Sequence, residues 1–154
     1  DATRLSRVES NLQRLALTAK LITADAATFV SPQLFDRILA DVPCTASGIV
    51  RRHVDIKWLR RESDIASFCK QQAAILANLW QLLAKGGKLL YVTCSIFNEE
   101  NQQQTDAFLQ KHIDATQLPL LITLEHENNI QQSNGQLIPN SHHDGLFYAL
   151  LQKN

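Results

Sequence analysis

The chain has 154 residues, which suits one domain, and its 45% hydrophobic and 19% charged residues argue against a disordered protein. Fifteen basic and fifteen acidic residues give a formal net charge of zero, which argues against a uniformly basic nucleic-acid-binding protein but not against a local basic patch. The chain contains no methionine and only five glycines, so we expect a piece of a longer protein without a glycine-rich nucleotide loop among these residues.

The first part of the chain predicts one helix, two strands and a basic loop. Apolar residues recur at helical spacing over residues 2–16, and a short apolar run over 19–23 indicates a strand. Residues 35–44 give a stronger strand signal, which Pro43 ends because proline cannot donate to a ladder. Residues 45–62 predict a long loop with a helical turn.

The second part predicts a regular alternation of helices and strands. Apolar residues from Phe68 to Leu83 follow helical spacing, and Gly86-Gly87 predicts the end of that helix. The remaining expected elements are a strand over 88–95, a helix over 98–111, a strand over 118–126, a polar loop over 127–144 and a strand over 146–153. This order predicts an α/β layered fold, with the last two strands as an antiparallel pair at one edge of the sheet.

The cysteine pattern and the hydropathy indicate where in the cell the protein is expected and which kinds of site it lacks. Three cysteines without a CxxC pair argue against a zinc site or a disulfide framework and favour reduced thiols in the cytoplasm. His142-His143-Asp144 has no further ligand at metal-binding spacing, so we expect no metal site there. No apolar stretch is long enough to span a membrane, so we expect no membrane association.

Ligands in open α/β sheets bind beyond the carboxyl ends of the strands, and several reactive residues are predicted there. Cys44 and Cys94 each follow a strand, where a thiol is either partly exposed and reactive or a small core residue. Asp41 and Asp25 are either ligand-binding carboxylates or local loop caps. Cys69 lies on a predicted helical face, and we assign it to packing.

A basic run lies over residues 49–61. Arg51, Arg52, Lys57 and Arg60 could contact nucleic-acid phosphates, although most basic runs are merely solvated.

Two long motifs in this order resemble those of a known family. Residues 41–58, DVPCTASGIVRRHVDIKW, resemble the fourth motif of the Sun/Fmu-type RNA cytosine-C5 methyltransferases, with Val42 where most members have alanine. Residues 86–101, GGKLLYVTCSIFNEEN, resemble the sixth motif with its Thr-Cys-Ser. The resemblance covers nearly the whole chain, is weakest over 127–143, and points to the RsmB type that acts on bacterial 16S rRNA. It implies a Rossmann-like S-adenosylmethionine-dependent methyltransferase fold truncated at its N-terminal side, with residues 1–154 as a partial catalytic domain.

The resemblance also implies a reaction and residue roles. A thiolate adds to C6 of an unstacked cytosine, which makes C5 nucleophilic enough to take a methyl group from S-adenosylmethionine. By resemblance, Cys94 is the nucleophile and Cys44 assists product release, although DNA cytosine methyltransferases attack with the Pro-Cys cysteine, so chemistry alone leaves this open. Asp41 would hold the cytosine edge, and Asp25, Asp41 and Pro43 would lie at the cofactor.

The family's glycine-rich loop, ribose-binding acid and N-terminal RNA-binding domain all precede Asp1 in the family order. We therefore expect this chain by itself to be inactive, to bind cofactor weakly and to self-associate through an exposed sheet edge. An alternative function is a non-catalytic RNA-binding or assembly module, which leaves the placement of the two cysteines unexplained. A thiol hydrolase or redox protein is disfavoured, because no histidine follows a strand and no CxxC is present.

Overall fold

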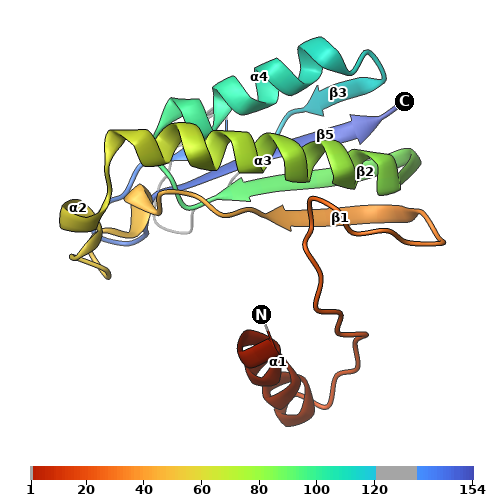
Figure 1. Cartoon of the computed structure of the whole chain (residues 1–154), viewed down its shortest axis with the longest axis horizontal. Helices are drawn as coiled ribbons and strands as arrows, with labels where there is room; N and C mark the ends of the chain where they lie inside the picture. Colours follow the sequence, from red (N-terminus) through yellow and green to blue (C-terminus); the bar gives the residue numbers. More distant parts are fainter. Residues whose placement is uncertain (1, 121–134) are drawn as a thin grey trace.

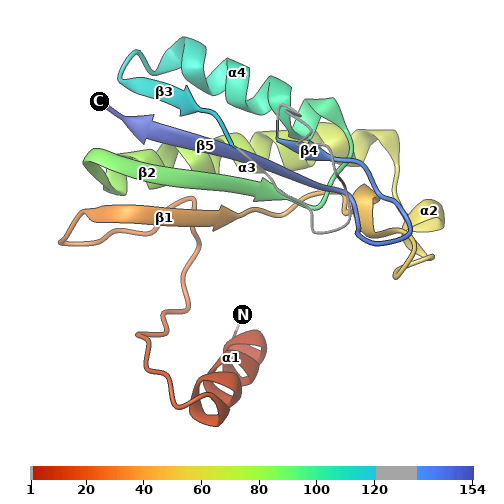
Figure 2. The ribbon, with the colours of Figure 1, turned by 180° about the vertical axis from the view of Figure 1, so that it is seen from behind.

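The computed structural model describes residues 2–120 and 135–154. A sheet forms one layer, helices α3 and α4 form a second layer on one of its faces, and α1 stands apart below β1 (Figures 1 and 2). In chain order the elements are α1 (Ala2–Arg14), β1 (Phe35–Asp41), the 3-10 helix η1 (Ser47–Ile49), α2 (Ile56–Leu59), α3 (Glu62–Leu82), β2 (Leu83–Thr93), the 3-10 helix η2 (Asn98–Glu100), α4 (Gln102–Lys111), β3 (Ala115–Leu118), β4 (Gln136–Leu137) and β5 (Leu146–Lys153). The predicted α/β layered fold is confirmed.

The sheet has the strand order β1-β2-β5-β3, with β4 also paired to β5. Strands β1 and β2 are parallel, and β5 is antiparallel to each of its partners. An antiparallel pair does lie at one edge of the sheet, but the strand beside β5 is β3 over Ala115–Leu118 rather than the expected 118–126, and β5 lies between β2 and β3. The parallel pairing of β1 with β2 brings both of their carboxyl ends to the same edge of the sheet.

The core lies between the sheet and α3. Alternate residues of β2 and β5 face this core, because side chains in a strand alternate between its two faces. The indole of Trp80 on α3 packs edge-on against Phe108 of α4, with ring centroids 5.1 Å apart, and donates a hydrogen bond from Nε1 to Asp114 Oδ2 at 3.1 Å. The central buried residues are Ile75, Leu76, Trp80, Leu83, Leu89, Tyr91, Phe147, Ala149 and Leu151.

Three expectations about elements need correction. Residues 19–23 form no strand; within the described chain no strand lies beside them to complete a ladder. Helix α3 ends at Leu82, so Gly86-Gly87 lies inside β2, where Gly86 has a φ of 78° near an irregularity in the pairing with β1. Strand β3 ends at Leu118, where the expected strand over 118–126 begins, and residues 121–126 lie outside the described ones.

Candidate active site

The loops that follow β1 and β2 run together and bring two thiols into contact. Asp41 at the end of β1 pairs in register with Val92 of β2. Beyond the strands, Val42 N donates to Val92 O at 3.1 Å and Gly48 N donates to Cys94 O at 2.9 Å. The Sγ atoms of Cys44 and Cys94, 50 residues apart in sequence, lie 3.3 Å apart.

The contact between the thiols shifts their pKa values in opposite directions. The hydrogen bond with Cys44 lowers the pKa of Cys94 to about 7, although partial burial and the carboxylate of Asp41 act in the opposite direction. The same hydrogen bond, together with burial, raises the pKa of Cys44 far above its ordinary value. Cys94 is therefore the thiol that ionises first, and Cys44 stays protonated as its hydrogen-bond donor.

A buried polar network that the sequence did not reveal joins the same two loops. The carboxylate of Glu100 on η2 is fully buried and accepts hydrogen bonds from Thr45 and Ser95, the residues that directly follow Cys44 and Cys94. The sequence predicts Glu100 only as part of the helix expected over residues 98–111. Its burial depends on Gln72 of α3 and on Thr45, which are 28 and 55 residues away in the chain.

The three residues predicted at the cofactor lie at different places. Asp41 is exposed at the end of β1, beside Cys94. Pro43 lies in the Cys44 loop, and its carbonyl accepts a hydrogen bond from Gln72 Nε2 at 2.9 Å. Asp25 is exposed, and its Oδ1 accepts a hydrogen bond from Ala27 N at 2.9 Å, which is the local capping contact considered as its alternative role.

The basic run has structural partners as well as exposed surface. Arg52 Nε lies 2.8 Å from Asp144 Oδ2, and Arg51 Nη2 lies 3.7 Å from Asp144 Oδ1. Arg60 donates from Nε to Thr45 O at 2.8 Å, and its guanidinium lies over the Phe68 ring. Thus three of the four predicted RNA-binding residues also hold the loops of the site in place.

Lys57 and Arg60 line a cavity of about 490 Å³ that reaches the two cysteine loops. Its other walls are Thr45, Ser47, Val50, Ile56, Arg61, Glu62, Ile65, Ile96 and Phe97. The cavity therefore places cationic groups beside the loops that carry the thiols.

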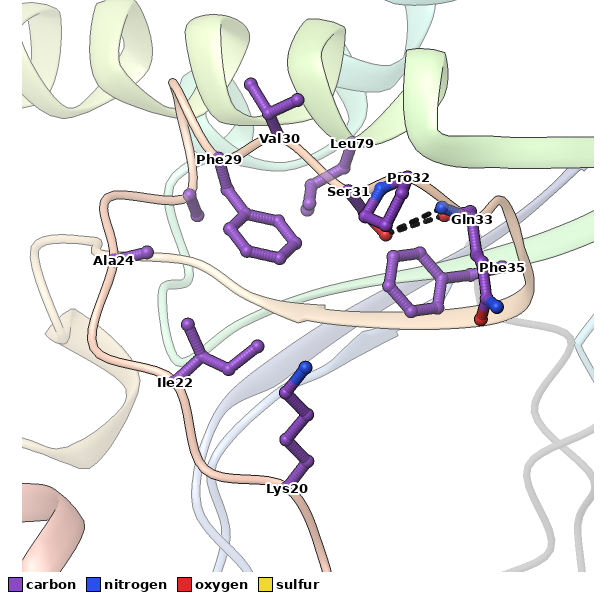
Figure 3. A pocket seen from close by; sticks show the side chains of 11 residues that line it. Lys20, Ile22, Ala24, Phe29, Val30, Ser31, Pro32, Gln33, Phe35 and Leu79 are labelled. Atoms are coloured by element: carbon purple, nitrogen blue, oxygen red, sulfur yellow. Dashed lines mark hydrogen bonds between the residues drawn. The ribbon is translucent and has the colours of Figure 1, made fainter.

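A second cavity, of about 700 Å³, lies at the start of β1. Figure 3 shows the rings of Phe29 and Phe35 directed into it, with Lys20 and Ile22 on the opposite wall. Because the thiols lie beyond the other end of β1, this mainly apolar cavity is separate from them.

Residues 2–120 and 135–154 contain neither a metal-binding cluster nor a membrane-spanning helix. No group of three or more His, Cys, Asp or Glu side chains in this part could hold a metal ion. Within the same ranges, no helix has the length and apolar character needed to cross a membrane.

Comparisons with known sequences agree with one another. A sequence model of the family described as 16S rRNA methyltransferase RsmB/F matches residues 1–152. The ribosomal RNA small subunit methyltransferase B of Shewanella oneidensis is 46% identical over 157 residues, covering 99% of this chain and 36% of that protein. The protein of the same name from Vibrio cholerae is 45% identical over 99% of this chain and 34% of its own length. The chain thus spans about a third of these relatives.

Solved structures show the same similarity in three dimensions. The crystal structure of PH0851 superposes with a TM-score of 0.86 at 31% identity, covering 99% of this chain and 35% of that one. NSun6 from Pyrococcus horikoshii, solved with SFG, superposes with a TM-score of 0.81 at 27% identity, covering 99% of this chain and 39% of that one. The chain therefore contains part of a Rossmann-like methyltransferase fold.

Proposed function

This chain belongs to the 16S rRNA methyltransferase RsmB/F family, and we propose on that basis that residues 1–154 are part of a catalytic domain that methylates C5 of a cytosine in 16S rRNA. The observation that carries the proposal is the contact of 3.3 Å between Cys44 and Cys94, because such a reaction needs one thiolate and a second group that handles protons. The roles of the two cysteines are those that the family resemblance implies, and the contact between their thiols supports them.

Cys94 is the nucleophile in this proposal. Its lowered pKa, about 7, makes a substantial thiolate fraction available at neutral pH. The thiolate adds to C6 of the cytosine, and the electron pair gained by the ring makes C5 nucleophilic. S-adenosylmethionine, when bound, supplies the methyl group that C5 takes. The demethylated donor would leave as S-adenosylhomocysteine. Solvent water then takes the C5 proton, the electron pair of that C–H bond restores the C5–C6 double bond, and the C6–Sγ electron pair returns to Cys94 as a thiolate, which releases the product.

Cys44 acts on release of the product. Its raised pKa keeps its proton in place, so it can donate a hydrogen bond that stabilises the Cys94 thiolate as the C6–Sγ bond breaks. In the same proposal Asp41 accepts hydrogen bonds from the amino edge of the base, and its exposure at the end of β1 supports this role.

The residues present fit only part of S-adenosylmethionine. Asp41 offers an exposed carboxylate at the carboxyl end of β1, and Pro43 and Asp25 complete the proposed contacts, but the sequence contains no glycine-rich loop to wrap the methionine end. We infer that the 154-residue polypeptide alone is inactive and binds S-adenosylmethionine weakly. A calorimetric titration that gave micromolar binding would contradict this inference.

The substrate contacts are assigned to Arg51, Arg52, Lys57 and Arg60. Arg51 and Arg52 keep 54% and 68% of their side-chain surfaces exposed despite the contacts with Asp144, so phosphate binding remains open to them. The non-catalytic alternative uses the same residues and predicts salt-dependent RNA binding that is unaffected by changes at either cysteine.

The test uses a full-length protein that contains this chain and methyl transfer from labelled S-adenosylmethionine to 16S rRNA. Cys94→Ala should abolish transfer, whereas Cys44→Ala should accumulate a covalent protein–RNA adduct that survives denaturing electrophoresis. Cys69→Ala is the matched control and should retain activity, because Cys69 lies on α3 and its thiol contacts Glu99 O. Activity in Cys94→Ala would refute the assignment of the nucleophile.

A further inference from the structure

Glu100 is a fully buried carboxylate whose partners are neutral. Among the ion pairs of the described residues, none involves Glu100. Its Oε1 accepts hydrogen bonds from Thr45 N at 2.9 Å and Gln72 Nε2 at 3.1 Å, and its Oε2 accepts from Thr45 Oγ1 at 2.6 Å and Ser95 Oγ at 2.5 Å. Burial of a carboxylate is costly unless its oxygens are satisfied, and four donors satisfy them here.

The donors connect this carboxylate to both cysteine loops. Thr45 follows Cys44, and Ser95 follows Cys94. Because both hydroxyls donate to Glu100, Ser47 Oγ is left to donate to Ser95 Oγ at 3.1 Å, and it accepts from Ile96 N at 3.0 Å. The carboxylate therefore accepts hydrogen bonds from the hydroxyls of both residues that follow the cysteines.

Other hydrogen bonds hold the backbone on both sides of Cys44. They come from Val42 N and Gly48 N, from Gln72 Nε2 to Pro43 O, and from Arg60 Nε to Thr45 O. A thiol is a weak donor, so the contact between Cys44 and Cys94 cannot by itself hold the Cys44 loop. Hydrogen bonds to a carboxylate are about twice as strong as neutral ones, so those of Glu100 can.

We propose that Glu100 is a positioning residue whose carboxylate, through Thr45 and Ser95, keeps Cys44 within hydrogen-bonding distance of Cys94. Its consequence for methyl transfer rests on the proposed function, but the positioning can be measured without RNA or S-adenosylmethionine. Loss of methyl transfer by Cys94→Ala tests the proposed function separately.

The acidity of Cys94 distinguishes positioning from a simple effect of charge. Three titratable groups act on this thiol: the hydrogen bond from Cys44 lowers its pKa, whereas the charges of Asp41 and Glu100 raise it. If Glu100 acted only as a nearby charge, weakening its influence would lower the pKa of Cys94. If Glu100 positions Cys44, breaking its contacts while keeping its charge should raise the pKa instead.

Glu100→Asp makes that change, because it keeps the carboxylate but shortens its reach by one methylene. The pH dependence of iodoacetamide alkylation is measured for the Cys94 peptide by mass spectrometry, which separates it from the other cysteines. We expect the midpoint to rise from about 7 towards the ordinary thiol value. With an ordinary value of about 8.5, alkylation at pH 7 would slow by up to about 15-fold. Cys44→Ala supplies the full loss of the thiol contact as a reference.

Glu99→Gln is the matched control, since it removes an exposed charge one residue away and should leave the midpoint unchanged. Thr45→Val provides a second, isosteric variant that removes one donor, and it should raise the midpoint by a smaller amount even if Glu100→Asp fails to fold. A folded Glu100→Asp or Thr45→Val protein with an unchanged or lower midpoint would overturn the proposal. A change in melting temperature without a change in midpoint would show a purely structural role.

Discussion

The loop after Cys44 depends on two small residues with unusual surroundings. Ala46 has a left-handed backbone with φ of 60°, and Gly48 contacts Gly145 so closely that a Cβ on Gly48 would lie 2.1 Å from the Gly145 carbonyl oxygen. Gly48→Ala should therefore destabilise the protein by about 2–3 kcal/mol, because the obstacle is backbone and cannot rotate away. Urea unfolding measures this change.

Ala46→Gly is the comparison in the same loop. A left-handed residue other than glycine is strained by about 1–2 kcal/mol, which offsets the extra chain entropy that glycine loses on folding. We expect Ala46→Gly to be neutral or slightly stabilising. Equal unfolding midpoints for Gly48→Ala and the unsubstituted protein would contradict the close approach to Gly145.

Local sequence pattern located the two cysteines but not the buried Glu100. Cys44 and Cys94 were located from sequence because each directly follows an apolar strand, and local pattern sets that position. Glu100 was missed because its surroundings come from loops and a helix that only the fold brings together. An acid beside Glu99 and Asn101 looks solvated in sequence, whereas in the structure Tyr91 Oη donates to its backbone carbonyl at 2.8 Å.

The strand β5 was predicted over its whole length. Two other predictions were wrong because local sequence patterns do not show which strands pair. Residues 19–23 have a strand-like composition but no partner strand within the described chain, and a strand is stable only in a sheet. Gly86-Gly87 was predicted to end the helix. Helix α3 instead ends at Leu82, because the next residue, Leu83, already pairs with Phe35 of β1. Pairing between strands thus decided both cases.

Ion pairs join the loop before β5 to the loop after η1. Asp144, just before β5, pairs with Arg52 and Arg51 beyond η1, and its side chain is only 10% exposed. Because the arginines are mostly exposed, Asp144→Asn should cost no more than about 1 kcal/mol of global stability. Locally, it should release the loop, so trypsin should cleave after Arg51 and Arg52 several-fold faster.

The matched control for that experiment is Asp55→Asn, which removes a charge in the same segment, at the N-cap of α2, where the side chain makes no capping hydrogen bond. Cleavage should then proceed at the rate of the unsubstituted chain. If Asp144→Asn were cleaved no faster than Asp55→Asn, the ion pairs would not be what holds this loop.

At the scale of the whole molecule, one edge of the described sheet is open and apolar. Strand β1 is its terminal strand, and Leu39 on β1 is 68% exposed. Leu34, directly before β1, is also exposed, as is Val30, which lines the apolar cavity shown in Figure 3. An unpaired strand with exposed apolar side chains is a template for pairing with another chain.

We therefore expect the 154-residue chain to self-associate as its concentration rises, which size-exclusion chromatography with light scattering would detect. Leu39→Lys should weaken association by roughly 10- to 100-fold, since burying a leucine is worth about 1.5–3 kcal/mol and lysine on an edge strand opposes pairing. Leu59→Lys, at a comparably exposed leucine on α2, should leave association unchanged. A monomer at every concentration, or equal association of the two variants, would show that the open edge of β1 is not the contact surface.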